Sequence, residues 1–202
     1  MANCCEDKSC AIEAMKAKQS STLKLVFLIN LALFALTVTY GLLANSTGLL
    51  MESLDDLGDA ATYALSLYVV YKSNQAKAKV ALIKGLLILI GAILVLSQVI
   101  LHIVNDTVPV FETMATVAFI ALLANCTCLL LLTKHKEQDI NMSSVWECSR
   151  NDILTNVSII VAAGVVGLTN AGWADVVLGL ILSVWLINSS VKVIKSALVQ
   201  LQ

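Results

Sequence analysis

The sequence predicts an all-α protein, a bundle of six transmembrane helices. Of its 202 residues, 58% are hydrophobic and 13% are charged, and the chain contains one proline. A helix that crosses the hydrocarbon core of a bilayer needs about 20 predominantly apolar residues. Six such helices with short connections use nearly all of the chain, which leaves no room for a separate soluble module. We therefore expect an integral, multi-pass protein of the inner or plasma membrane, surrounded by the lipid bilayer.

Six apolar segments of the required length follow one another along the chain. The first begins after a polar N-terminal segment, a basic connection separates the second from the third, and another separates the fourth from the fifth. We place the spans at residues 22–45, 47–71, 80–104, 112–133, 145–168 and 173–196. Because consecutive spans cross the membrane in opposite directions, every second connection lies on the same side.

The positive charges lie on one set of these alternate connections. Lysines occur before or within the opening of the first span, between the second and third, between the fourth and fifth, and at the end of the sixth: Lys8, Lys16, Lys18, Lys24, Lys72, Lys77, Lys79, Lys134, Lys136, Lys192 and Lys195. The opposite connections, residues 44–48, 105–111 and 169–172, contain no Lys or Arg. Since cytoplasmic loops of membrane proteins carry the excess positive charge, we expect both termini in the cytoplasm.

The chain divides into residues 1–21, a cytoplasmic N-terminal tail, and residues 22–202, the six-helix transmembrane domain. The tail contains Cys4, Cys5 and Cys10 in a Cys-Cys-x4-Cys pattern. Cytosolic thiols stay reduced, so we do not expect a disulfide framework here. The three thiols could capture or deliver a soft metal ion, or they could be an adventitious cluster on a disordered segment. Both interpretations stay open.

The second span carries four carboxylates where an apolar helix is expected: Glu52, Asp55, Asp56 and Asp59. An acidic side chain at the centre of a membrane helix costs roughly 2.5–3.5 kcal/mol on insertion scales. A chain that retains four such groups must have something for them to bind. The sequence therefore predicts a cation site.

Two pairs of residues have the spacing that a shared ligand needs. Asp55 and Asp59 are four apart and stack on one helix face, and Cys148 and Asp152 have the same spacing on the fifth span. If these two spans pack side by side, three carboxylates and one thiolate converge. Four such ligands suit tetrahedral Zn²⁺ or Cd²⁺, and the thiolate favours the softer ion.

These residues resemble the signatures of a known family, the cation diffusion facilitators, which are six-helix transporters of divalent metals. Residues 47–59 look like the family's second-helix signature, in which His or Asp precedes a second Asp by four. Ser149-Arg150-Asn151-Asp152, followed by Asn156, looks like its fifth-helix signature, where His normally precedes the Asp by four. With the six spans and cytoplasmic termini, the resemblance covers about residues 22–196.

The chain departs from the family's pattern at three points. Cys148 stands where His is usual, so Cd²⁺, Hg²⁺ or another thiophilic ion is as plausible as Zn²⁺, and Glu52 stands where Asp is common. The chain ends at Gln202, so we expect no C-terminal soluble domain of the kind that senses metal and dimerises in the family. A homodimer would then be held by membrane helices.

A competing pair of ligands exists within the second span. Glu52 and Asp56 are also four residues apart and could replace Asp55 and Asp59. We favour the latter pair because its distance from Ser46 matches the offset usual in the family. Glu52 and Asp56 would then serve the path of the ion, a proton site or the surroundings of the ligands. Asn156, one turn beyond Asp152, would bridge two helices through a hydrogen bond or act as a weak ligand.

The expected function is efflux of a divalent transition metal, Zn²⁺, Cd²⁺ or a similar thiophilic ion. The resemblance implies exchange for protons by alternating access, so the partners are metal ions and protons. A membrane metal sensor or buffer without transport, and a cation channel, are the alternatives. We expect no prosthetic group and no nucleic-acid surface. We expect no enzyme either, because no nucleophile and base occur together in the spans.

Overall fold

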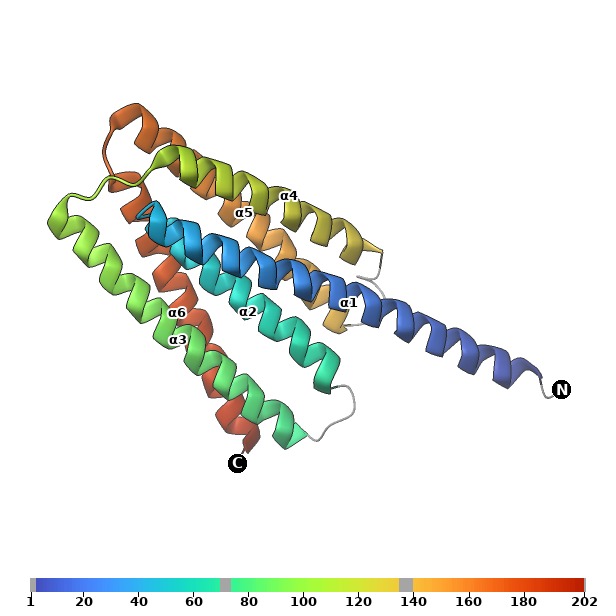
Figure 1. The fold of residues 1–202 in the computed structure, drawn as a ribbon. Helices are drawn as coiled ribbons and strands as arrows, with labels where there is room; N and C mark the ends of the chain where they lie inside the picture. Colours follow the sequence, from blue (N-terminus) through green and yellow to red (C-terminus); the bar gives the residue numbers. More distant parts are fainter. Residues whose placement is uncertain (1–2, 70–73, 135–139, 202) are drawn as a thin grey trace.

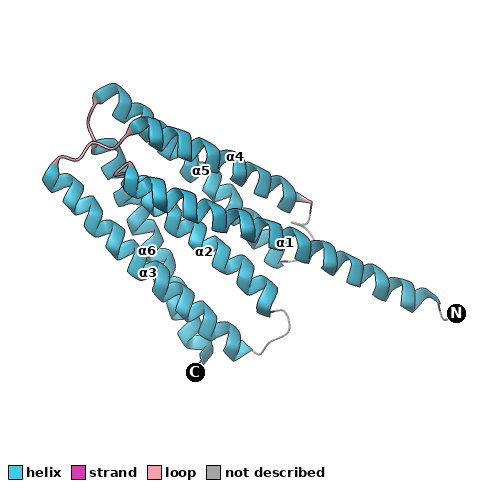
Figure 2. Ribbon diagram, viewed as in Figure 1, coloured by secondary structure: helices cyan, strands magenta, loops and turns pink. Residues whose placement is uncertain are grey.

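A computed structural model describes residues 3–69, 74–134 and 140–201, and it contains six helices (Figures 1 and 2). They are α1 (Asn3–Leu43), α2 (Thr47–Val69), α3 (Asn74–Asn105), α4 (Phe111–Thr133), α5 (Ile140–Thr169) and α6 (Trp173–Leu201). The description omits the side chains of residues 3–19, 65–69, 74–78, 80–81, 84, 140–145, 147–148, 196 and 200. No strand occurs in the described ranges, and the predicted all-α six-helix bundle is confirmed.

Four helices, α1, α3, α5 and α6, extend further at their lysine-rich ends than the predicted spans. Helix α1 begins at Asn3 rather than at residue 22, so the segment expected to be a separate tail continues the first span (Figure 1). That segment is rich in Ala, Glu, Lys and Met and contains no Gly or Pro, a composition that favours helix outside the bilayer as well. Cys4, Cys5 and Cys10 lie on this extension, with side chains outside the described part.

The helices α1, α3 and α5 end in the same local structure. Asn45, Asp106 and Asn170, which lie within two residues of the ends of these helices, have φ values of 51°, 49° and 49°. Asn and Asp tolerate this left-handed conformation better than other residues with a side chain, and it is a common way to end a helix. The three short polar connections therefore stop the helices at one end of the bundle.

The bundle is arranged around α2. This helix contacts α1, α3, α5 and α6, while α4 packs against α1 and α5, and α3 pairs with α6. The beginning of α1 and the end of α6 lie at one end of the bundle, and the three left-handed turns lie at the other (Figure 1). The four carboxylates of α2 are therefore held among neighbouring helices.

Five helices contain a stretch long and apolar enough to cross a membrane: Ser20–Leu43, Gly85–Asn105, Phe111–Thr133, Ser149–Thr169 and Trp173–Val199. Among the described residues, α2 does not meet this measure because its carboxylates interrupt the apolar run. Its neighbours supply the apolar outer surface instead, with side chains such as Leu87, Ile90 and Leu94 of α3 exposed. A prediction based on length and apolarity alone would miss this second span. The central position of α2 among the other helices explains how a helix with four carboxylates is accommodated in the membrane.

Candidate metal centre

Three carboxylates of α2 are buried and have hydrogen-bond partners. Thr37 Oγ1 of α1 donates to Asp56 Oδ2 at 2.9 Å, and Asn156 Nδ2 of α5 donates to Glu52 Oε1 at 2.5 Å. The Tyr63 hydroxyl donates to Asp59 Oδ2 at 3.4 Å. Glu52 and Asp56 therefore tie α2 to different neighbours. The expected bridging hydrogen bond of Asn156 is confirmed.

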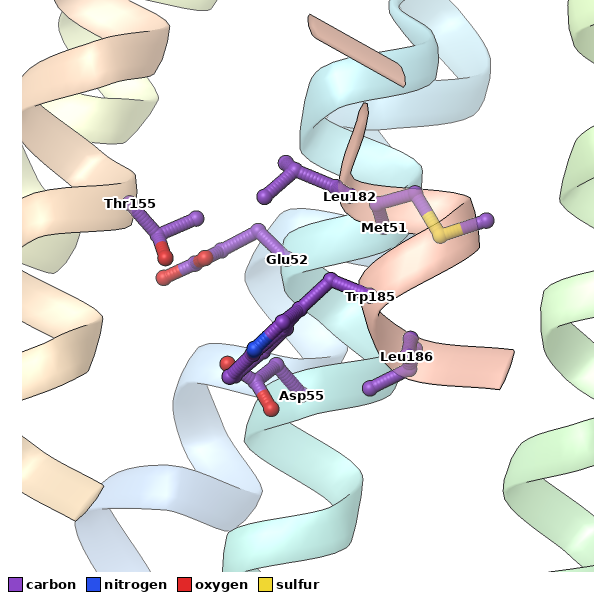
Figure 3. Close-up of a pocket in the computed structure, with 7 residues that line it drawn as sticks. All are labelled: Met51, Glu52, Asp55, Thr155, Leu182, Trp185 and Leu186. Atoms are coloured by element: carbon purple, nitrogen blue, oxygen red, sulfur yellow. The ribbon is translucent and has the colours of Figure 1, made fainter. Parts of the chain in front are cut away.

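Asp55 lies in a different environment from the other three. It is partly exposed and lines a cavity of about 10 Å³, enough for about one water molecule. Thr155 of α5 and Trp185 of α6 also line this cavity, and Figure 3 shows the Asp55 carboxylate beside the indole ring while Glu52 points toward Thr155. Asp55 thus faces the junction of α2, α5 and α6.

Asp152 is the buried carboxylate that α5 contributes. It is 5% exposed, and its Oδ2 atom has no hydrogen-bond partner within the described part of the chain. Its helix, α5, packs directly against α2, which contains the other buried carboxylates. The structure therefore places Asp152 on the helix that packs against the acidic part of α2, and its grouping with Asp55 and Asp59 in one site stays a prediction.

The described side chains do not form a complete metal site around the carboxylates of α2 and α5. Among the described side chains, no three of His, Cys, Asp or Glu lie close enough together to hold a metal ion. The fourth predicted ligand, Cys148, lies on α5 with its side chain outside that description. What the structure brings together is the pair of helices, α2 and α5, and the carboxylates between them.

Where side chains are described, no buried positive group compensates the buried acids. Glu52, Asp56, Asp59 and Asp152 are each at most 7% exposed, and no lysine or arginine is among the buried side chains that the structure describes. A buried charge without a partner is strongly unfavourable. These carboxylates therefore require protons or a bound cation.

Asp175, at the start of α6, is a buried carboxylate of another kind, and the sequence analysis missed it. Its oxygens accept hydrogen bonds from Ser46 Oγ at 2.7 Å, Thr47 N at 2.7 Å, Thr47 Oγ1 at 2.9 Å and Gly48 N at 3.0 Å. These donors form the beginning of α2, where free backbone N–H groups attract an anion. Asp175 is therefore satisfied within the protein and fixes α2 to α6. Its partners lie more than a hundred residues earlier, so no local spacing could reveal them.

The described part of the helical membrane bundle encloses carboxylates but no buried lysine or arginine. This arrangement is typical of a membrane protein that binds cations. The chain matches the cation efflux transmembrane domain over residues 23–202, and it belongs to that family. It is thus an integral, multi-pass membrane protein that transports metal cations, and the predicted family is confirmed. No curated protein matches the chain.

Proposed function

We propose that the protein exports a divalent transition metal, Zn²⁺, Cd²⁺ or a similar thiophilic ion, in exchange for protons. The observation that supports this proposal is the group of buried carboxylates, Glu52, Asp56, Asp59 and Asp152, which no buried lysine or arginine of the described part neutralises. Carboxylates and thiols must lose their protons to hold a metal, so protons and metal compete for the same groups. Loading at the higher pH of the cytoplasm and release into a more acidic exterior follow from this competition.

The proposed ligands are Asp55, Asp59, Cys148 and Asp152. The hydrogen bonds of the competing pair favour this choice, since Glu52 is bonded to α5 and Asp56 to α1. Those two carboxylates point to different helices, which does not suit a pair sharing one ion. Asp152, on the neighbouring α5, retains a carboxylate oxygen without a partner in the described structure, which leaves it available to an ion held with Asp55 and Asp59.

Two apolar clusters cover the carboxylates from opposite ends, which supports alternating access. Cluster A consists of Leu49, Met114, Val117, Ala118, Ile159 and Ala163, near the left-handed turns. Cluster B consists of Leu23, Val26, Tyr63, Cys128 and Leu132, toward the other end. We infer that the clusters open in turn, and that metal binding draws α2 and α5 together around the ion.

The cytoplasmic position of both termini is also part of the proposal. The described ends of α1 and α6 share one end of the bundle (Figure 1). Exposed lysines lie at that end, Lys79 on α3, Lys134 directly after α4 and Lys195 on α6. This distribution agrees with the positive-inside rule. Cluster B then covers the cytoplasmic side of the carboxylates.

Transport by the purified protein in sealed vesicles tests this function. Uptake of Zn²⁺, Cd²⁺, Co²⁺ and Hg²⁺ is measured against an imposed pH gradient, with a pH dye recording protons in the same vesicles. We expect saturable uptake of at least one ion, accompanied by proton movement in the opposite direction. Metal binding without flux would instead identify a sensor or buffer, and flux that does not saturate would identify a channel.

Cys148→His tests the identity of the transported ion. A thiolate prefers softer ions than an imidazole does, so we expect the variant to transport Zn²⁺ better relative to Cd²⁺. The ratio of the two initial rates in the vesicle assay is the measurement. Cys126→Ser, on the neighbouring α4, is the matched thiol control and should leave the ratio unchanged. An unaltered ratio in Cys148→His would remove this thiol from the ligands.

A further inference from the structure

Asn125, in the middle of α4, is a buried polar residue without an internal partner. It is 0% exposed, and neither its Oδ1 nor its Nδ2 atom has a hydrogen-bond partner in the described part of the chain. Buried polar side chains in folded proteins are almost always hydrogen-bonded, so an amide that leaves both groups unused needs an explanation. A ligand that is bound during the working cycle would supply one.

The position of Asn125 on α4 directs it toward the carboxylates. It belongs to the single buried stripe of the helix, between Ala121 and Cys128. On that stripe, Met114 lies in cluster A and Cys128 in cluster B, with Asn125 between them. Helix α2 also contacts both clusters, with Leu49 in cluster A and Tyr63 in cluster B, and all four of its carboxylates lie between these two residues.

Helix α5 gives the same placement independently. Its contacts run from Ile159 in cluster A to Trp146 beside cluster B, and Asp152 lies between them. Cys128, one turn from Asn125, is close enough to Asp152, Asp56 and Asp59 to be affected by their charges. Asn125 thus lies at the level of the carboxylates, next to cluster B.

Two further uncharged side chains lie in the same interval of their helices. Asn30 of α1 donates from Nδ2 to Val26 O at 2.9 Å, but its Oδ1 atom has no partner among the described residues. Ser149 of α5 is 0% exposed, and its Oγ atom is likewise without a partner there. Three helices therefore each contribute one uncharged buried residue with a free oxygen, on the cluster B side of the carboxylates.

We propose that Asn125 is a specificity-determining residue that contacts the cation, its amide oxygen replacing water on the cluster B side of the carboxylates together with Asn30 and Ser149. The inference rests on the proposed function, because it requires a cation at the carboxylates. Uncharged oxygen atoms provide additional ligands for the cation without adding to the repulsion between the buried carboxylates. They also favour oxygen-preferring ions over thiophilic ones, which counters the preference set by a thiolate.

The test is direct metal binding by the purified full-length protein in detergent, with dissociation constants measured calorimetrically for Mn²⁺, Zn²⁺ and Cd²⁺. Asn125→Leu keeps a similar volume but removes both polar groups. We expect it to weaken Mn²⁺ and Zn²⁺ binding by about 10–100-fold and Cd²⁺ binding by less, so that the affinity ratio shifts toward Cd²⁺. A merely structural role would alter all three affinities alike.

Two further variants make the outcome decisive. Thr127→Val changes an exposed residue of the same helix, whose hydroxyl bonds Leu123 O, and should match the wild type. Asn125→Ser retains an oxygen and should keep the wild-type order of affinities, which also covers the case in which the Leu variant does not fold. Two results would overturn this inference but leave the proposed function intact. One is an Asn125→Leu variant with the wild-type ratios of metal affinities, and the other is the same change in the order of affinities in both Asn125 variants. A wild type that binds none of the ions would overturn the proposed function with it.

Discussion

Asp152→Asn is expected to abolish metal transport, lowering the initial rate of flux in vesicles by about 100-fold or more. The substitution removes a negative charge and a carboxylate oxygen that has no partner in the described structure, while the shape of the side chain is preserved. It also removes a buried charge that no buried lysine or arginine of the described part of the chain compensates. The metal-free variant should therefore be at least as stable as the wild type.

The combination of lost flux and retained stability distinguishes a ligand from a structural carboxylate. Thermal unfolding in detergent, with and without metal, gives the second measurement. A metal that binds only the folded protein raises the unfolding temperature, and the variant should lose this rise. Glu112→Gln, an exposed carboxylate at the start of α4, is the matched control and should behave as the wild type. Near-normal flux in Asp152→Asn would contradict the proposed site.

Asp175→Ala is expected to lower the free energy of unfolding by about 3–5 kcal/mol, since it leaves several buried donors without an acceptor. The donors are the side chains of Ser46 and Thr47 and the backbone N–H groups of Thr47 and Gly48. Ser46 also caps α2 locally, accepting from Leu49 N at 3.2 Å. Loss of the carboxylate should therefore loosen the beginning of α2 and its attachment to α6.

Unfolding by titration with a denaturing detergent measures this effect. Asp175→Asn retains one acceptor oxygen and the shape of the side chain, so it should lose less stability than the Ala variant and still bind metal. Asp106→Asn removes an exposed charge from a connection at the same end of the bundle, keeps a residue type that tolerates the left-handed conformation there, and serves as the control. An unchanged unfolding midpoint in Asp175→Ala would show that the hydrogen bonds to α2 contribute nothing to stability.

Asp152 and Asp175 show why burial alone does not identify a ligand. Both are carboxylates within the bundle, at 5% and 0% exposed. The start of α2 supplies Asp175 with N–H and O–H donors, so that its charge is balanced by the protein itself. Asp152 has an oxygen without a hydrogen-bond partner among the described residues, and its helix packs against the acidic α2. The first arrangement stabilises a fold, whereas the second requires a proton or a cation.

The class of the protein could be predicted from the sequence, because membrane spans depend on local properties. Length and apolarity identify five of the six spans, and the alternation of lysines requires a sixth, the acidic second span, between the first and the third. The spacing of Asp55 with Asp59 and of Cys148 with Asp152 was likewise visible, since a helix repeats every 3.6 residues. The first span was placed close to the apolar stretch Ser20–Leu43, and the helix continues beyond it to Asn3 because the preceding residues have high helix propensity.

The partners of the buried polar groups were decided only by the tertiary structure. Periodicity indicates which residues share a face of one helix, but not which other helix that face meets. The bonds of Asp56 to α1 and of Glu52 to α5 therefore became visible only in the packed bundle, as did the contact of Asp175 with the start of α2. The sequence by itself determined that the membrane interior contains four acids on one helix. Their different environments follow from the packing of α1, α4, α5 and α6 around them, because the energy of a buried charge depends on what surrounds it.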